Sequence, residues 1–321
     1  MREASQLASE AMALIESLGD PTLTVGLSSA AIYAKLESGE WSDVLRWSQR
    51  VIELADGDPS KGNFIYGCPL AMALTARAIA RCGLGRPGWR DDQRQSLATA
   101  RSADPMSHAM VASRVYFPGI TMGVLRPDDS AVREIEDALQ MADRSGDDFA
   151  VSLARMTLGV ALVHRHTAAE RDRGHKLLAE VSEVFLRRGH NLCELPLINV
   201  YVARERARRG DRDAAIPLMR ATTDDLVRQG QLLVWGVPAT GVLVETLLDR
   251  GAESGCCGCG LSWHVLAAIR RLTCSSGMAT ATWRELLALT GISPGPRRCH
   301  DRNEIGLRRM WCRVAGRREI L

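Results

Sequence analysis

Residues 204–216 read Arg-Glu-Arg-Ala-Arg-Arg-Gly-Asp-Arg-Asp-Ala-Ala-Ile and describe a joint between two helices. Gly210 suits the left-handed conformation that ends a helix, and the Asp211 side chain can accept from the free N–H groups that start the next. Pro217 then falls just inside the following helix, where it removes one backbone donor, so we expect that helix to start later or to bend. Variants of this joint recur along the chain, which predicts a repetitive helical scaffold.

Stops of this kind divide the first 252 residues into alternating helices. First helices end near residues 19, 57, 104, 146, 189 and 230, and second helices end near residues 39, 85, 126, 166, 210 and 251. Equivalent stops are 38 to 47 residues apart. A period in the low forties is typical of stacked helix pairs, because one amphipathic pair cannot bury its apolar face alone. The alternatives are a HEAT-like array and an irregular helical bundle.

We therefore predict an all-α fold, a tetratricopeptide-like helical-repeat solenoid of about six helix pairs over residues 1–252, followed by an irregular tail over residues 253–321. Pro118 and Gly119 are expected to kink or shorten one helix. The predicted helices cover residues 1–18, 22–37, 41–55, 70–84, 91–103, 106–125, 129–145, 149–166, 173–188, 192–209, 213–229 and 234–250.

The overall composition is that of an ordinary soluble protein. Of the 321 residues, 46% are hydrophobic and 25% are charged. The longest apolar stretches, such as residues 195–203, are much shorter than the ~18 residues that a membrane span needs. The first residues carry no apolar signal core. We expect a cytoplasmic protein that has no membrane partner.

The tail differs from the rest of the chain in charge and in cysteine content. From residue 255 onward there are eleven arginines and four acidic residues, a balance of +7 within a net charge of +3, which leaves −4 for the residues before it. Cys68, Cys82 and Cys193 are spread through the first part and are predicted to be buried thiols. The other six cysteines crowd the tail, which we expect to be poorly ordered.

Zinc is the one metal that this tail suggests. Cys256, Cys257, Cys259 and Cys274, with further candidates in Cys299, His300 and Cys312, could supply tetrahedral ligands. Their spacing is not that of two Cys-x-x-Cys pairs, so no metal site is predicted and zinc in the tail stays an alternative.

No catalytic constellation emerges elsewhere. His164 and His166 point about 200° apart on a helix, so they cannot grip one ion and are expected to be surface residues at a helix end. No Gly-x-Ser-x-Gly elbow and no Gly-Lys-Ser or Gly-Lys-Thr phosphate loop is present. We predict that the chain is not an enzyme and binds no cofactor.

The candidate interaction residues are aromatic or basic. Arg204 and Arg208 belong to a positive cluster that could meet phosphate or nucleic acid, but interleaved acids and a helix C-terminus favour a solvated helix end. Trp41, Trp89 and Trp235 lie at or near helix starts and are expected to pack between repeats or to line a concave groove. The predicted partner is a protein or small ligand on the concave face, and nucleic acid is not expected.

Four segments of the sequence together carry a resemblance to a known family: Gly-Glu-Trp-Ser-Asp at 39–43, Gly-Arg-Pro-Gly-Trp at 85–89, residues 204–216, and Val-Leu-Val-Glu-Thr-Leu-Leu at 242–248. Over about residues 1–252 the chain resembles the C-terminal tetratricopeptide-like region of bacterial multidomain signalling proteins. In these proteins a class III adenylate or guanylate cyclase domain, or a LuxR-type helix-turn-helix domain, is joined to an ATPase of the STAND type.

The resemblance implies a sensor or scaffold arm without the catalytic domains, either a fragment or a separate gene product. Its function would be non-catalytic: binding a protein or ligand so as to bias an attached domain. The alternative is a LuxR-type regulator fragment or DNA-binding protein that acts through the basic tail.

The tail departs from this family, which would continue as acidic, alanine-rich helix. A shift of reading frame would produce such a break. Codons for residues 299–309, read one base later, can encode Ala-Met-Thr-Glu-Thr-Arg-Leu-Gly-Phe-Glu, which resembles the family's C-terminus. Residues 253–321 are therefore interpreted as a frameshifted segment, and sequencing the gene would test this.

Overall fold

A computed structural model describes residues 2–65, 67–189, 193–229 and 231–249 of the chain. Within these residues the fold is all-α, and it consists of helices that follow one another in pairs. The tail after residue 252, with its predicted disorder, cysteines and frameshift, lies outside the described residues. The elements are α1 (Arg2–Ser17), α2 (Pro21–Glu37), α3 (Trp41–Ala55), α4 (Pro69–Gly83), α5 (Trp89–Ala103), α6 (Pro105–Thr121), α7 (Asp129–Ser145), α8 (Asp148–Val163), α9 (Ala168–Arg188), α10 (Leu195–Arg208), α11 (Arg212–Arg228), the π-helical turn η1 (Leu232–Gly236) and α12 (Val237–Asp249).

Several helix ends lie where the local stop signals predict them. The carboxylates of Asp104 and Asp147 accept hydrogen bonds from backbone N–H groups in the first turns of α6 and α8, at 2.7 and 2.8 Å. Gly146 and Gly189 adopt the left-handed conformation directly after α7 and α9. Such residues satisfy the free N–H groups at a helix start and allow the chain to turn at its end, so the stops predicted near residues 104, 146 and 189 are confirmed.

The boundaries differ from the prediction by three or more residues in α6, α8, α9, α10 and α12. Helix α9 begins at Ala168, five residues early, because Thr167 accepts from the N–H of Glu170. Helix α10 begins at Leu195, three residues late. Helix α6 ends at Thr121, four residues earlier than predicted, so it is shortened but still contains Pro118, whereas α11 begins at Arg212, within one residue of the predicted start, and contains Pro217.

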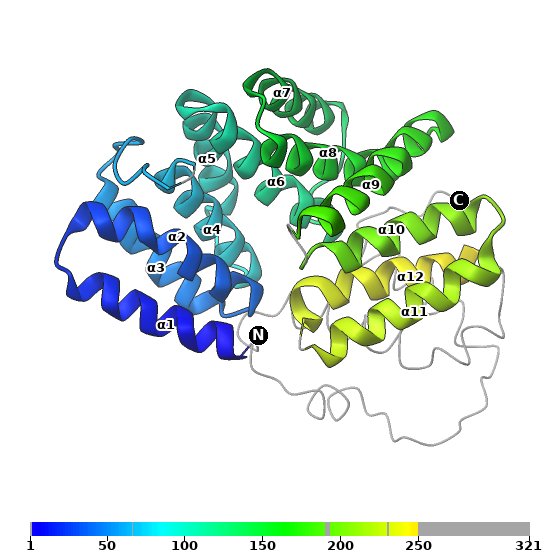
Figure 1. The fold of residues 1–321 in the computed structure, drawn as a ribbon, viewed down its shortest axis with the longest axis horizontal. Coiled ribbons are helices and arrows are strands. Elements are labelled where there is room, and N and C mark those ends of the chain that lie inside the picture. Colours follow the sequence, from blue (N-terminus) through cyan, green and yellow to red (C-terminus); the bar gives the residue numbers. More distant parts are fainter. Residues whose placement is uncertain (1, 66, 190–192, 230, 250–321) are drawn as a thin grey trace.

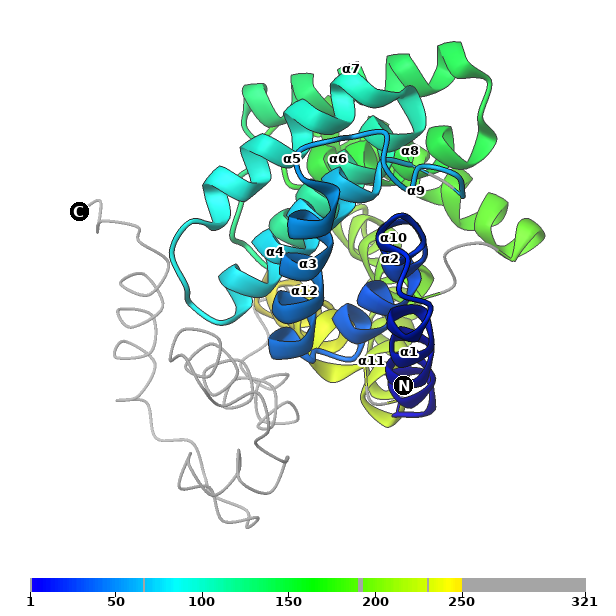
Figure 2. The ribbon, with the colours of Figure 1, turned by 90° about the vertical axis from the view of Figure 1, so that its left-hand side faces the viewer.

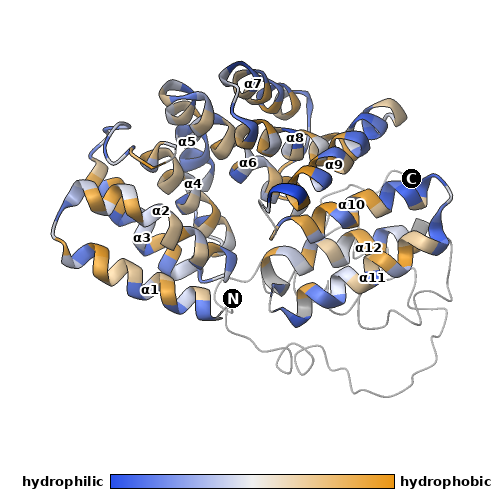
Figure 3. Cartoon of the chain, viewed as in Figure 1, coloured by the Kyte–Doolittle hydropathy of each residue, from blue (hydrophilic) through white to orange (hydrophobic). Residues whose placement is uncertain are grey.

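Two layers of helices follow the arch that Figure 1 shows. The even-numbered helices α2, α4, α6, α8, α10 and α12 contact one another in this order, and each odd-numbered helix packs on its even neighbours. Odd helices such as α1 and α9 carry both hydrophilic and hydrophobic stripes (Figure 3). Helix α8, by contrast, is buried along almost its whole length. The even helices therefore form the inner layer.

The ends of the arch lie near each other. Helices α1 to α3 form one side and α10 to α12 the other (Figure 1), and the view turned by 90° looks from the side of α1 to α3 towards that of α10 to α12 (Figure 2). Among the described helices, none is both long enough and apolar enough to cross a membrane.

Candidate functional site

The five candidate interaction residues do not form one site. Trp41 and Trp89 are half-buried. The Trp41 ring lies against Gly83 of α4, where a Cβ would come within 3.2 Å of it, and the Arg90 guanidinium lies 4.1 Å from the centre of the Trp89 ring. Trp41 therefore packs within its own helix pair, formed by α3 and α4.

Arg204 is buried, and the expectation of a solvated helix end is wrong for this residue. Only 2% of it is exposed. Its Nη2 donates to the carbonyl oxygen of Val163 at 2.7 Å, and its guanidinium lies 4.9 Å from the centre of the Tyr201 ring. The last carbonyls of a helix lack partners within the helix, so this arginine satisfies the C-terminus of α8. Arg208 is exposed and pairs with Glu205 at 2.8 Å.

His164 is also not the surface residue that we expected. It is half-buried, its Nδ1 lies 2.8 Å from the Val160 carbonyl, and its ring meets Tyr201 edge-on with centroids 5.1 Å apart. Burial and the charge of Arg204 lower the pKa of His164 to about 3. The imidazole is therefore neutral near pH 7. His166 is exposed, as predicted.

Trp235, in η1, leads to a different site. Its Nε1 donates to Oε2 of Glu37 in α2 at 2.6 Å, across 198 residues of sequence. Its ring packs against Phe117 of α6, with centroids 5.7 Å apart. Only 4% of Trp235 is exposed. This side chain therefore joins the first and last helix pairs inside the arch.

A second contact joins the same parts of the chain. The hydroxyl of Tyr33, also on α2, donates to Oε1 of Glu194 at 2.9 Å. Glu194 directly precedes α10 without a side-chain hydrogen bond to its first turn, and the neighbouring Cys193 thiol donates to its Oε2 at 2.8 Å. The guanidinium of Arg114, from α6, lies 3.5 Å from the centre of the Tyr33 ring. We call this group the closure cluster: Tyr33, Glu37, Arg114, Cys193, Glu194 and Trp235.

The carboxylates of the closure cluster are in an unusual environment. Glu37 and Glu194 are 6% and 3% exposed. Burial, together with the charge of Glu194, raises the pKa of Glu37 to about 7, while Arg114 and the Trp235 N–H act in the opposite direction. Burial also raises the pKa values of Tyr33 and Cys193. Tyr33 therefore stays a donor and Cys193 a neutral thiol in the absence of a ligand.

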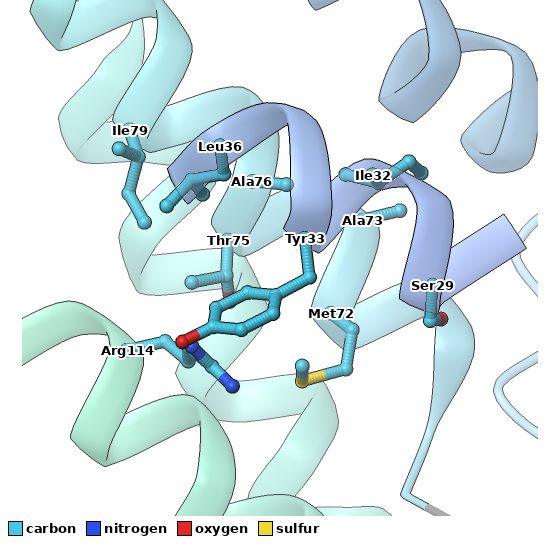
Figure 4. A pocket seen from close by; sticks show the side chains of 10 residues that line it. All are labelled: Ser29, Ile32, Tyr33, Leu36, Met72, Ala73, Thr75, Ala76, Ile79 and Arg114. Atoms are coloured by element: carbon cyan, nitrogen blue, oxygen red, sulfur yellow. The ribbon is translucent and has the colours of Figure 1, made fainter. Parts of the chain in front are cut away.

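A pocket opens beside the closure cluster on the inner side of α2 and α4. It contains about 360 Å³ of space, including the part that is open to solvent. Figure 4 shows Tyr33 and Arg114 side by side at its polar end, with apolar side chains around the rest. Its lining is Ser29, Ile32, Tyr33, Leu36, Met72, Ala73, Thr75, Ala76, Ile79 and Arg114.

Of the residues of this site, only Trp235 was predicted from the sequence to be an interaction residue. Helical periodicity identifies which residues of a helix face the core, but it carries no information on how far a row of repeats curves. Contacts over 161 and 198 residues depend on that curvature. The one available signal was Glu37, an acid on the buried side of a helix, because burial of an unpaired acid is costly.

Comparison of the chain with known protein families, curated proteins and solved structures gives no match.

The raised pKa of Glu37 predicts a pH-dependent stability. A carboxyl with a higher pKa in the folded state stabilises the fold below its unfolded pKa of 4.5, and this contribution is lost as the pH rises to about 7. With a chelator present, the free energy of unfolding of the native chain should fall by about 2–3 kcal/mol relative to Glu37→Gln between pH 5 and pH 8. Urea unfolding at both pH values measures this difference, and a constant difference would contradict the assignment.

Proposed function

We propose that this chain is a non-catalytic sensor or interaction scaffold, which binds a protein partner or a small ligand on the inner face of its arch. The observation that carries the proposal is the closure cluster, because it ties the first helix pair to the last two through a few side chains. The contacts that helix α2 makes with α1, α3 and α4 are far more extensive than any it makes with α10 or α12.

Such an arrangement supports a switching role. Small changes in the angle between successive helix pairs add up along a solenoid. The two ends of the arch can therefore separate while each helix pair stays intact. A ligand shifts this equilibrium only if it binds one state more tightly than the other. The pocket shares Tyr33 and Arg114 with the closure cluster, so an occupant there would contact the residues that hold the ends together.

The resemblance to the helical arm of cyclase and LuxR-type signalling regulators agrees with this role. In that setting, the arm would transmit the opening or closing of the arch to an attached domain. We expect no nucleotide turnover from the chain itself, which an assay with ATP and GTP checks.

Filling the pocket tests the proposal. Ser29→Trp places an indole into the pocket, whereas Ala30→Trp, one residue along α2, places it on the exposed surface. The experiment uses the full chain and its two variants as baits and measures the captured proteins and metabolites by quantitative mass spectrometry. We expect one occupant to be recovered with the native chain and with Ala30→Trp. Its recovery with Ser29→Trp should be at least tenfold lower. Equal recovery by all three would contradict binding at the inner face.

A further inference from the structure

The closure cluster contains three potential metal ligands from distant parts of the chain. One donor atom each from Glu37, Cys193 and Glu194 lies within 4.8 Å of the other two. Glu37 ends helix α2, and the other two residues directly precede α10. Zinc bonds to oxygen and sulfur are about 2.0–2.3 Å long, which sets tetrahedral ligand atoms about 3.5 Å apart. Small side-chain rotations would therefore bring the three donors around one centre.

One of these donors lacks any partner among the described residues. Oε1 of Glu37 is buried and accepts no hydrogen bond, although the residue is only 6% exposed. Leaving a buried carboxylate oxygen unpaired is costly. The other oxygen, Oε2, is held by the Trp235 N–H. The carboxylate is thus oriented with its free oxygen in the cluster, where a cation would satisfy it.

The Glu194 carboxylate is oriented for metal binding in the same way. Its Oε1 accepts from the Tyr33 hydroxyl, while its Oε2 accepts from the Cys193 thiol at 2.8 Å. A metal ion bound by Sγ and Oε2 would take the place of that thiol hydrogen. Each carboxylate then has one oxygen fixed by an outer donor and one directed to the metal, which is how protein metal ligands are usually oriented.

The charges of the cluster select the ion. Two carboxylates and one thiolate carry −3, and the Arg114 guanidinium beside them carries +1, so one divalent cation makes the cluster neutral. A thiolate among the ligands favours zinc over magnesium or calcium, which prefer oxygen alone.

From these observations we propose that Glu37, Cys193 and Glu194 bind one zinc ion that joins α2 to the start of α10. Water, reaching the cluster through the pocket beside Tyr33 and Arg114, would complete the tetrahedron. Zinc binding would stabilise the closed arch, because two of its ligands lie more than 150 residues from the third. This inference goes beyond the proposed scaffold function and is independent of which partner occupies the inner face.

The experiment separates this site from the cysteines of the tail. The starting protein is the full chain with the six cysteines of the tail replaced by serine, treated with chelator, dialysed and titrated with zinc or cobalt. We expect one zinc per chain by elemental analysis, thiolate-to-cobalt absorption in the near ultraviolet, and a higher melting temperature with zinc. Cys193→Ser should abolish the cobalt band, whereas Cys82→Ser, which removes a thiol of α4, should leave it intact.

Two further variants keep the test decisive if Cys193→Ser does not fold. Glu37→Gln keeps the volume of the side chain and should bind zinc at least tenfold more weakly, with an unchanged far-ultraviolet circular dichroism spectrum. Tyr33→Phe removes only the outer donor and should weaken binding about tenfold. Absence of zinc from the starting protein, or the same affinity in Cys193→Ser or Glu37→Gln, would overturn the proposal.

Discussion

Trp235→Ala is expected to lower the free energy of unfolding by about 3–5 kcal/mol, which is the usual cost of truncating a buried tryptophan. The indole is 4% exposed and packs against Phe117, so its removal leaves a cavity between η1 and α6. It also deprives the buried Glu37 of its N–H donor. Because the same side chain joins the ends of the arch, the radius of gyration from small-angle scattering should increase as well.

Two control variants divide this effect into its parts. Trp235→Phe keeps most of the ring volume and removes the N–H, so it should cost about 1–3 kcal/mol. Trp89→Ala truncates a half-buried tryptophan that does not contact the closure cluster, and it should leave the radius of gyration unchanged. Equal scattering curves for the native chain and Trp235→Ala would show that the tryptophan does not hold the arch closed.

Asp92→Ala should cost a similar amount, about 3–5 kcal/mol, because it breaks a buried ion pair and leaves the partner charges unpaired. Asp92 is 3% exposed, in the first turn of α5. The guanidinium of Arg77 binds both of its oxygens, at 2.6 and 3.0 Å, and Arg81 adds a contact of 2.7 Å. These arginines belong to α4, so the cluster fixes one helix pair to the next.

The neighbouring Asp91 is a matched control for this prediction. Its side chain is 73% exposed and pairs with Arg94 on the same helix. Exposed pairs of this kind contribute little, so Asp91→Ala should change the free energy of unfolding by less than about 0.5 kcal/mol. Similar losses for the two variants in urea unfolding would mean that the Arg77 and Arg81 contacts do not stabilise the joint.

The helices could be predicted from the sequence because their ends are determined locally. The predicted helices at 41–55 and 129–145 coincide with α3 and α7. The start of α9 was misplaced although its signal was present, since Thr167 and Glu170 have the spacing of a capping box. The π-helical turn at Leu232–Gly236 has no such signal. Apolar and glycine residues in that region suit several helical geometries, and packing decides between them.

The site could not be predicted in this way, because its members are brought together by the curvature of the whole array. Tyr33 and Glu37 read as ordinary positions of a second helix, and Cys193 as a buried thiol. Arg204 shows the reverse error: a charged phrase suggested an exposed cluster, but the side chain turns back to the end of α8. Such long side chains reach buried carbonyls that a periodic pattern does not reveal.

A double-mutant cycle on Tyr33→Phe and Glu194→Ala tests the central claim most directly, that residues 161 positions apart hold the arch closed. Urea unfolding of the native chain, the two single variants and the double variant gives the energy of this contact alone. We predict a coupling of about 1 kcal/mol or more, as expected for a hydrogen bond to a buried carboxylate. Strictly additive effects of the two substitutions would contradict the closed arch.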